Sequence, residues 1–169
     1  MKLFVGPLDD VATICAAHRP SHLVSWLSPP AEAPEIAASF APTRRLLLAS
    51  HDIVELTEGF QAPSADDVAR LIAFARDWDR AQPMLVHCWA GVSRSTAAAY
   101  VVACALGSRS EREIAQALRR ASPSATPNPL IVRHADALLG REGRMVQAIA
   151  EIGRGAECML GAPFELQPF

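Results

Sequence analysis

The sequence has no long hydrophobic run. Its longest apolar segment, 97–106, is far shorter than the ~20 residues that a bilayer-spanning helix needs. The start of the chain also lacks the pattern of a signal peptide, because only three apolar residues separate Lys2 from Gly6 and Pro7. We therefore expect a cytoplasmic protein that does not associate with membranes.

Cysteine is scarce, and its spacing excludes the common zinc patterns. The four cysteines, Cys15, Cys88, Cys104 and Cys158, lie far apart and form no CxxC pair. Widely spaced cysteines of this kind are typical of reduced thiols in a cytoplasm. The sequence therefore implies neither a metal nor another cofactor.

An excess of charge of one sign is also missing. The chain has 16 basic and 18 acidic residues and a formal net charge of −2, whereas a nucleic-acid binder normally carries a basic surplus. Half of the 169 residues are hydrophobic and a fifth are charged, which is typical of a globular protein. This length predicts a single domain over 1–169, with an irregular tail at about 154–169.

Short apolar segments alternate with segments of helical periodicity. Strands are predicted at 2–5, 23–27, 45–49 and 83–87, and the run at 45–49 is apolar enough for burial on both faces. Helices are predicted after Asp10, with Val11, Ile14, Cys15 and His18 inward, after Ser64, over 95–106, after Ser110, after Asn128 and before Gly153. The order predicts a three-layer α/β sandwich with a central, mainly parallel sheet. In the tail, Phe164, Leu166 and Phe169 are expected to dock on the body or on another subunit.

One segment carries a recognisable chemistry. Residues 87–95 read His-Cys-Trp-Ala-Gly-Val-Ser-Arg-Ser and lie between a predicted buried strand and a predicted buried helix. Ligands of open α/β sheets bind at the carboxyl ends of the strands, and the start of a helix presents free N–H groups to an anion. At the base of this turn, N–H dipoles would favour the thiolate form of Cys88. The thiolate could attack phosphorus and form a cysteinyl phosphate.

The other residues of this segment fit a phosphate cradle. The planar guanidinium of Arg94 can bind two phosphate oxygens, and Gly91 lets the backbone approach closely. The remaining cradle positions are filled by Trp89, Ala90, Val92 and Ser93. Trp89 could line the mouth of the site or pack beneath the loop, Ser95 could cap the helix or reach the sulfur, and His87 is expected beneath the loop in a supporting role.

This segment resembles the signature loop of the cysteine-dependent protein tyrosine phosphatases, in which His-Cys is followed by five residues, Arg, and Ser or Thr. Its place in the chain is similar to that in the tyrosine and dual-specificity superfamily, over roughly residues 40 to 121. The resemblance implies a dual-specificity-phosphatase-like fold, Cys88 as nucleophile, Arg94 as phosphate ligand and Ser95 as an aid to breakdown of the intermediate.

The resemblance also implies an acidic residue upstream of the cysteine that protonates the leaving oxygen. Asp52 is the best candidate, because it follows the strand at 45–49 and precedes Cys88 by 36 residues. Glu55, Glu58, Asp66 and Asp67 are the competitors, the last two being expected to cap the helix after Ser64.

The expected function is hydrolysis of a phosphate monoester, with phosphotyrosine in a protein as the first choice of substrate. Phosphoserine, phosphothreonine and small phosphate monoesters stay open, and so do phosphoinositides and inositol phosphates, although the loop carries no lysine. Two further alternatives are a weakly catalytic phosphate-binding module and a rhodanese-like sulfur carrier. The sequence does not determine the oligomeric state.

Overall fold

The structure, a computed structural model, describes residues 2–30 and 32–167. Its sheet has the strand order β3-β2-β4-β1-β5. The strands are β1 (Leu3–Pro7), β2 (His22–Leu27), β3 (Arg44–Ala49), β4 (Met84–Cys88) and β5 (Phe164–Leu166). The first four strands pair in parallel, and β5 pairs with β1 in the antiparallel direction. The prediction of a mainly parallel sheet is confirmed.

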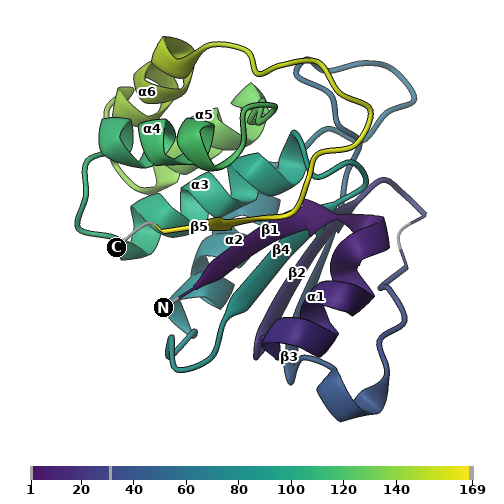
Figure 1. Ribbon diagram of the computed structural model, residues 1–169. Coiled ribbons are helices and arrows are strands. Elements are labelled where there is room, and N and C mark those ends of the chain that lie inside the picture. Colours follow the sequence, from purple (N-terminus) through teal and green to yellow (C-terminus); the bar gives the residue numbers. More distant parts are fainter. Residues whose placement is uncertain (1, 31, 168–169) are drawn as a thin grey trace.

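Helices cover both faces of this sheet (Figure 1). One face carries α1 (Val11–His18), and the helices of the other face are α2 (Ala65–Arg76), α3 (Arg94–Leu106), α4 (Glu111–Ala121), α5 (Pro129–Leu138) and α6 (Arg144–Ile152). Short 3₁₀ turns lie at Leu8–Asp10 and Ala38–Phe40. The predicted three-layer α/β sandwich is therefore confirmed. Among the residues that the structure describes, no helix is both long and apolar enough to cross a bilayer.

Alternation along the strands divides the core between the two faces. Phe4, Leu23 and Leu85 pack with α1, whereas Val5 and Val86 belong to the larger core beneath α2 and α3. This division follows from the strand geometry, because successive side chains point to opposite faces. The predicted central helix is confirmed as α3, in which the eleven residues 94–104 are all buried.

The predicted helix starts are confirmed by their capping contacts. Ser64 and Asp67 form a capping box at α2, and Ser110 and Glu113 form another at α4. At α5 the Asn128 side chain accepts hydrogen bonds from two backbone N–H groups, with a proline at the first helical position. These local patterns depend on residues three positions apart, which is why the sequence alone predicts them.

Three expectations need correction. The strand at 45–49 is not buried on both faces, because in β3, the edge strand of the sheet, only Leu48 is buried while Leu46 and Leu47 are half-buried. His18 is exposed and lies stacked on Phe4 rather than inside the core. The tail is not wholly irregular, because Phe164 and Leu166 lie in β5, where Leu166 is buried on the body of the protein. Phe169 lies outside the described residues.

Candidate active site

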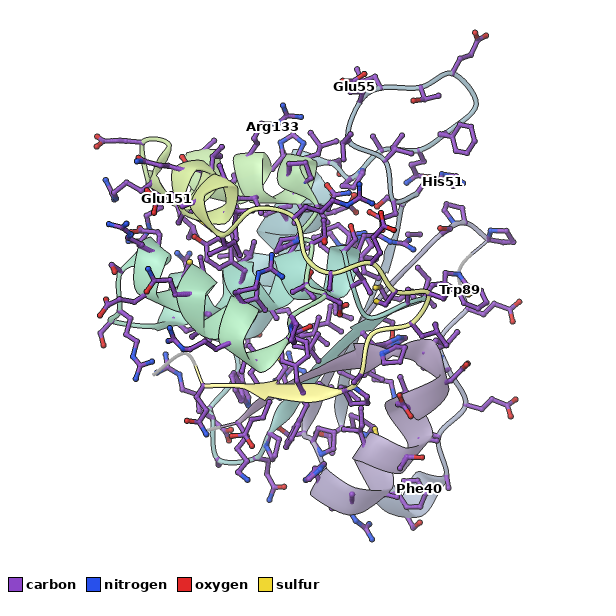
Figure 2. The ribbon with its side chains drawn as sticks, turned by 45° about the horizontal axis from the view of Figure 1, so that its top comes forward. Phe40, His51, Glu55, Trp89, Arg133 and Glu151 are labelled. Atoms are coloured by element: carbon purple, nitrogen blue, oxygen red, sulfur yellow. The ribbon has the colours of Figure 1, made fainter. Side chains whose placement is uncertain are left out.

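The loop between β4 and α3 lies at the carboxyl end of the central strands. The parallel register pairs Cys88 with Pro7 at the end of β1 and His87 with Ser25 in β2. From Arg94 onward the chain is helical. The loop 89–93 is thus held between a buried strand and a buried helix, as its sequence predicts, and Figure 2 shows Trp89 at its outer side.

The Cys88 thiol lies at the base of this loop. The residue is only 2% exposed, and its Sγ is 3.1 Å from the hydroxyl oxygen of Ser95. Ser95 is fully buried in the first turn of α3. Of the two roles considered for Ser95, the structure therefore supports contact with the sulfur rather than capping of the helix.

The carbonyl groups of the loop face outward and accept hydrogen bonds from other segments. The Trp89 carbonyl accepts from the Leu8 N–H at 3.1 Å, and the Val92 carbonyl accepts from the Thr126 N–H at 2.9 Å. The C=O and N–H of a trans peptide point in opposite directions. The N–H groups that follow these carbonyls therefore face the inside of the loop, where an anion would accept from them.

Gly91 allows the loop to contact the end of β1. Its φ is +72°, a left-handed conformation that favours glycine. A Cβ at this position would lie 2.7 Å from the backbone nitrogen of Pro7 and 2.8 Å from the carbonyl carbon of Gly6. The close approach that the structure shows at Gly91 is to the end of β1, while its expected approach to an anion stays a prediction.

The Arg94 guanidinium is buried and is held in place by hydrogen bonds to residues that follow β2 and β3. The residue is 3% exposed. Its Nη1 donates to the Ser50 carbonyl at 2.7 Å and to the Ser28 hydroxyl at 3.1 Å. Its Nε has no hydrogen-bond partner among the described residues. A buried donor without a partner is costly, and an anion in the loop would supply one.

Asp52 lies beside this guanidinium. One carboxylate oxygen, Oδ1, accepts from the Ser93 hydroxyl at 2.7 Å and from the Asn128 side-chain amide at 2.8 Å. The other, Oδ2, is 3.8 Å from Arg94 Nε. The Asp52 side chain remains about one-third exposed, so a substrate in the loop could reach it. The structure thus brings Asp52, from the segment after β3, next to the segment 87–95 that carries Cys88 and Arg94.

His87 lies beneath the loop. It is fully buried, with Nε2 at 2.7 Å from the Ser25 hydroxyl and Nδ1 at 3.4 Å from the Cys88 carbonyl. Burial lowers the pKa of His87 to about 4. A neutral imidazole fits these partners, since Nδ1–H can donate to the carbonyl while Nε2 accepts from the hydroxyl.

The competing acidic residues lie elsewhere. Glu55 and Glu58 are exposed, and Figure 2 shows Glu55 on the outer part of a loop that extends away from Trp89. Asp67 is part of the α2 capping box, which confirms the capping prediction for that residue. Asp66 is exposed in the first turn of the same helix. Asp52 is thus the predicted acid that contacts the loop.

The structure also resolves what surrounds the mouth of the loop. Trp89 is 57% exposed, so it lies on the outside of the loop and does not pack beneath it. His51 accepts a hydrogen bond from the Gln61 N–H and lies edge-on to Phe60. Arg133 donates to the Val54 carbonyl. The side chains of His51 and Arg133 therefore stabilise the loop that follows Asp52.

Three residues of the site were missed by sequence reasoning. Ser28 and Ser50 follow β2 and β3 at the carboxyl ends where ligands bind in such sheets, and this rule could have singled them out. Asn128 was recognised only as a helix cap. Its amide also donates to the Ile53 carbonyl at 3.1 Å, a contact that crosses 75 residues of sequence.

No protein-family model matches the chain, and no curated protein is significantly similar to it. Solved structures do match. The protein is similar to DUSP15, with 19% identity, a TM-score of 0.64 and coverage of 88% of this chain and 90% of the other. It is also similar to the Yvh1 phosphatase domain from Chaetomium thermophilum, with 20% identity, a TM-score of 0.56 and coverage of 85% and 93%.

The fold is that of the dual-specificity phosphatases. The similarity extends well beyond residues 40 to 121, over which the sequence itself shows the resemblance. At these identities it establishes the fold, while the chemistry has to be argued from the residues of the site.

Proposed function

We propose that this protein is a cysteine-dependent phosphatase that hydrolyses phosphate monoesters through Cys88. The observation that carries the proposal is the buried Arg94, whose Nε has no hydrogen-bond partner among the described residues while Nη1 is held from behind. A phosphate on the inward N–H groups of 89–94 would accept from this Nε. It would also lie directly above the Cys88 sulfur, at the base of the loop.

In the first step the Cys88 thiolate attacks phosphorus, and the bond from phosphorus to the ester oxygen breaks. Asp52 gives its proton to the leaving oxygen, and the product alcohol or phenol departs. The neutral His87 beneath the loop supports the backbone and takes no part as a base.

In the second step water attacks the cysteinyl phosphate. Asp52, now a carboxylate, takes a proton from this water, and the bond from phosphorus to sulfur breaks. Ser95, 3.1 Å from the sulfur, donates a hydrogen bond to the departing thiolate. Inorganic phosphate leaves, and the enzyme returns to its starting state.

Phosphotyrosine in a protein is the proposed substrate. Cys88 is almost fully buried whereas Trp89 is 57% exposed, so a phosphate must descend past an aromatic side chain to reach the sulfur. A long aryl phosphate suits that depth, and Trp89 offers an apolar contact for the ring.

The four cysteines are all free, and a nucleophilic thiol needs reducing conditions, so we also propose a cytoplasmic location.

The test is hydrolysis of an aryl phosphate by the purified protein, with and without vanadate. We expect turnover that vanadate inhibits. The Arg94→Ala variant should lose both this turnover and the binding of vanadate. Vanadate binding without turnover would instead support the phosphate-binding module. The absence of both would overturn the proposal.

A further inference from the structure

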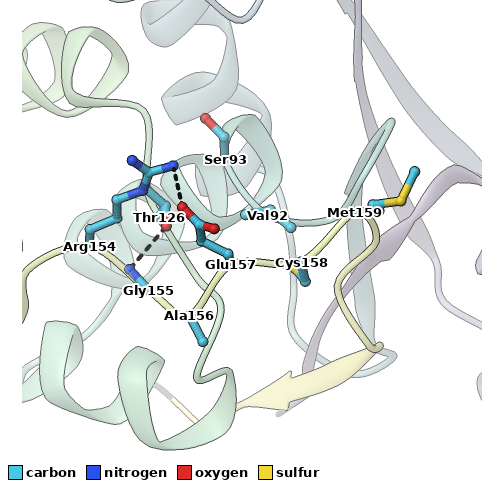
Figure 3. A pocket seen from close by; sticks show the side chains of 9 residues that line it. All are labelled: Val92, Ser93, Thr126, Arg154, Gly155, Ala156, Glu157, Cys158 and Met159. Carbon is cyan, nitrogen blue, oxygen red and sulfur yellow. Dashed lines mark hydrogen bonds and ion pairs between the residues drawn. The ribbon is translucent and has the colours of Figure 1, made fainter.

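The segment that follows α6 returns to the loop 89–93, which we call the phosphate loop. We call residues 154–163 the C-terminal strap; it connects α6 to β5. Near its start, the Gly155 N–H donates to the Thr126 hydroxyl at 3.1 Å and the Ala156 N–H donates to the Pro123 carbonyl at 2.9 Å. Figure 3 shows the strap running from Thr126 towards Val92, along a pocket of about 510 Å³ on the outer side of the loop.

Near its other end, the strap contacts the phosphate loop directly. The Gly161 N–H donates to the Ala90 carbonyl at 2.8 Å. This bond comes from a residue 71 positions further along the chain, and it completes the outward bonding already described for Trp89 and Val92. Since the two ends of a peptide unit point in opposite directions, the same bond orients the Gly91 N–H towards the inside of the loop.

The orientation of this one peptide matters because Gly91 is the most permissive residue of the loop. A peptide beside a glycine rotates more readily than others, because glycine adopts both signs of φ. A rotated Ala90–Gly91 peptide would present a carbonyl oxygen to the anion in place of an N–H group. The electrostatic value of the loop depends on donors that are already oriented before the anion arrives.

Position 161 leaves little room for a side chain. A Cβ there would lie 3.1 Å from the Gly91 carbonyl oxygen and 3.3 Å from a methyl group of Val92. Gly161 does not have a positive φ, so the close approach and not the backbone angle favours glycine. The strap therefore contacts three consecutive residues of the loop, 90–92, at one point.

We propose that Gly161 is a positioning residue of the phosphate site, acting through the Ala90–Gly91 peptide. In this account the strap is a working part of the anion-binding loop, although it lies outside the signature segment. The inference rests on the proposed function, because it assumes that the loop binds a phosphate or a phosphate analogue.

The test compares Gly161→Pro with Gly161→Ala. Both variants add a Cβ at the tight position, but only proline removes the N–H group. We expect Gly161→Pro to weaken vanadate binding by about tenfold, the effect of one well-made hydrogen bond, with Gly161→Ala within about threefold of the wild type. Equal vanadate affinity of the two variants would overturn the inference.

A second measurement does not depend on how the proline variant folds. Hydrogen exchange in the wild-type protein reports the Gly161 amide directly, and we expect vanadate to slow it more than the amides of β3, because opening the bond from Gly161 to Ala90 would disturb the loop that holds the anion. A strap that only stabilises the fold would show no more slowing at Gly161 than at amides far from the loop, which would overturn the inference. Failure of the wild type to bind vanadate would instead overturn the proposed function, so the two failures are distinguishable.

Discussion

The phosphate loop and the segment after β3 contribute to the same site in opposite ways. In the loop, Cys88 and Arg94 are buried, and the outward carbonyls accept hydrogen bonds from distant segments. In the segment after β3, residues 54–61 are all exposed, and Asp52 reaches the site through a few polar contacts. The proposed anion-binding groups thus lie in a buried part of the fold, whereas the position of the proposed acid depends on individual hydrogen bonds.

This contrast predicts that substitutions in the loop and around Asp52 affect different steps. The loop should govern binding of the phosphate and attack on it, regardless of the leaving group. The Asp52 side should govern departure of the leaving group, and its effect should grow as that group becomes more basic.

The largest effect is expected for Cys88→Ser. A hydroxyl is a far poorer nucleophile at neutral pH, so hydrolysis should fall by at least about 10⁴-fold. Affinity for a phosphotyrosine peptide should stay close to that of the wild type, as measured by calorimetry. Near-normal turnover in this variant would assign the chemistry to another group.

Asp52→Asn is expected to slow hydrolysis of phosphotyrosine by about 10²–10⁴-fold. The loss should be smaller for a nitrophenyl phosphate, whose leaving group needs little protonation, and the alkaline limb of the pH–rate profile should flatten. These rates would be measured by steady-state kinetics across a series of leaving groups.

Glu55→Gln and Glu58→Gln are the matched controls, because both carboxylates lie on the exposed loop that follows Asp52. Neither change should alter the rate or the leaving-group dependence. If one of them reproduced the expected behaviour of Asp52→Asn while that variant did not, the acid would lie further along the loop.

A smaller effect is expected for Asn128→Ser. Serine can still cap α5, but its short side chain cannot reach Asp52 Oδ1, to which Asn128 donates at 2.8 Å. We expect kcat for phosphotyrosine to fall by about tenfold, with unchanged vanadate affinity and a melting temperature close to that of the wild type. An equal fall for the nitrophenyl phosphate would show that Asn128 does not act through Asp52.

The smallest expected effect concerns His87, which should change how the free energy of unfolding depends on pH and leave the rate near neutral pH almost unchanged. Burial lowers the pKa of His87 to about 4, below its value of about 6.5 in an unfolded chain. Between these values the unfolded state binds more protons, so stability falls as the pH falls from about 6.5 to 4, by at most about 3 kcal/mol from this group.

Denaturant unfolding at several pH values would measure this dependence, with His87→Asn for comparison. The free energy of unfolding should depend less steeply on pH in the variant over this window. His22, whose pKa is also lowered by burial, is present in both proteins and cancels in the difference. Identical slopes would contradict a neutral, buried His87.

The sequence is sufficient for those features that depend on nearby residues. The spacing of Ser64 and Asp67 predicts a helix cap, and the segment from His87 to Ser95 predicts the strand, the loop and the start of the helix. The capping bonds and the loop are formed by residues that are close together in the sequence, so the sequence predicts them directly.

Features formed by distant residues could not be predicted in this way. The double role of Asn128, the contact of Gly161 with Ala90 and the edge position of β3 all depend on how segments meet in space. Ser28 and Ser50 are common residue types, and only the strand order brings their oxygens to Arg94. The sequence thus predicts the proposed phosphate-binding segment, but it does not predict the distant residues that hold this segment and Asp52 in place.

The most direct test of the central claim is a rapid acid quench of the wild-type protein during hydrolysis of an aryl phosphate. Mass spectrometry of the digested protein would then locate any transferred phosphoryl group. The account predicts one phosphoryl group on the peptide that contains Cys88, formed and consumed at rates compatible with turnover. Steady hydrolysis without phosphoryl transfer to Cys88 would contradict it.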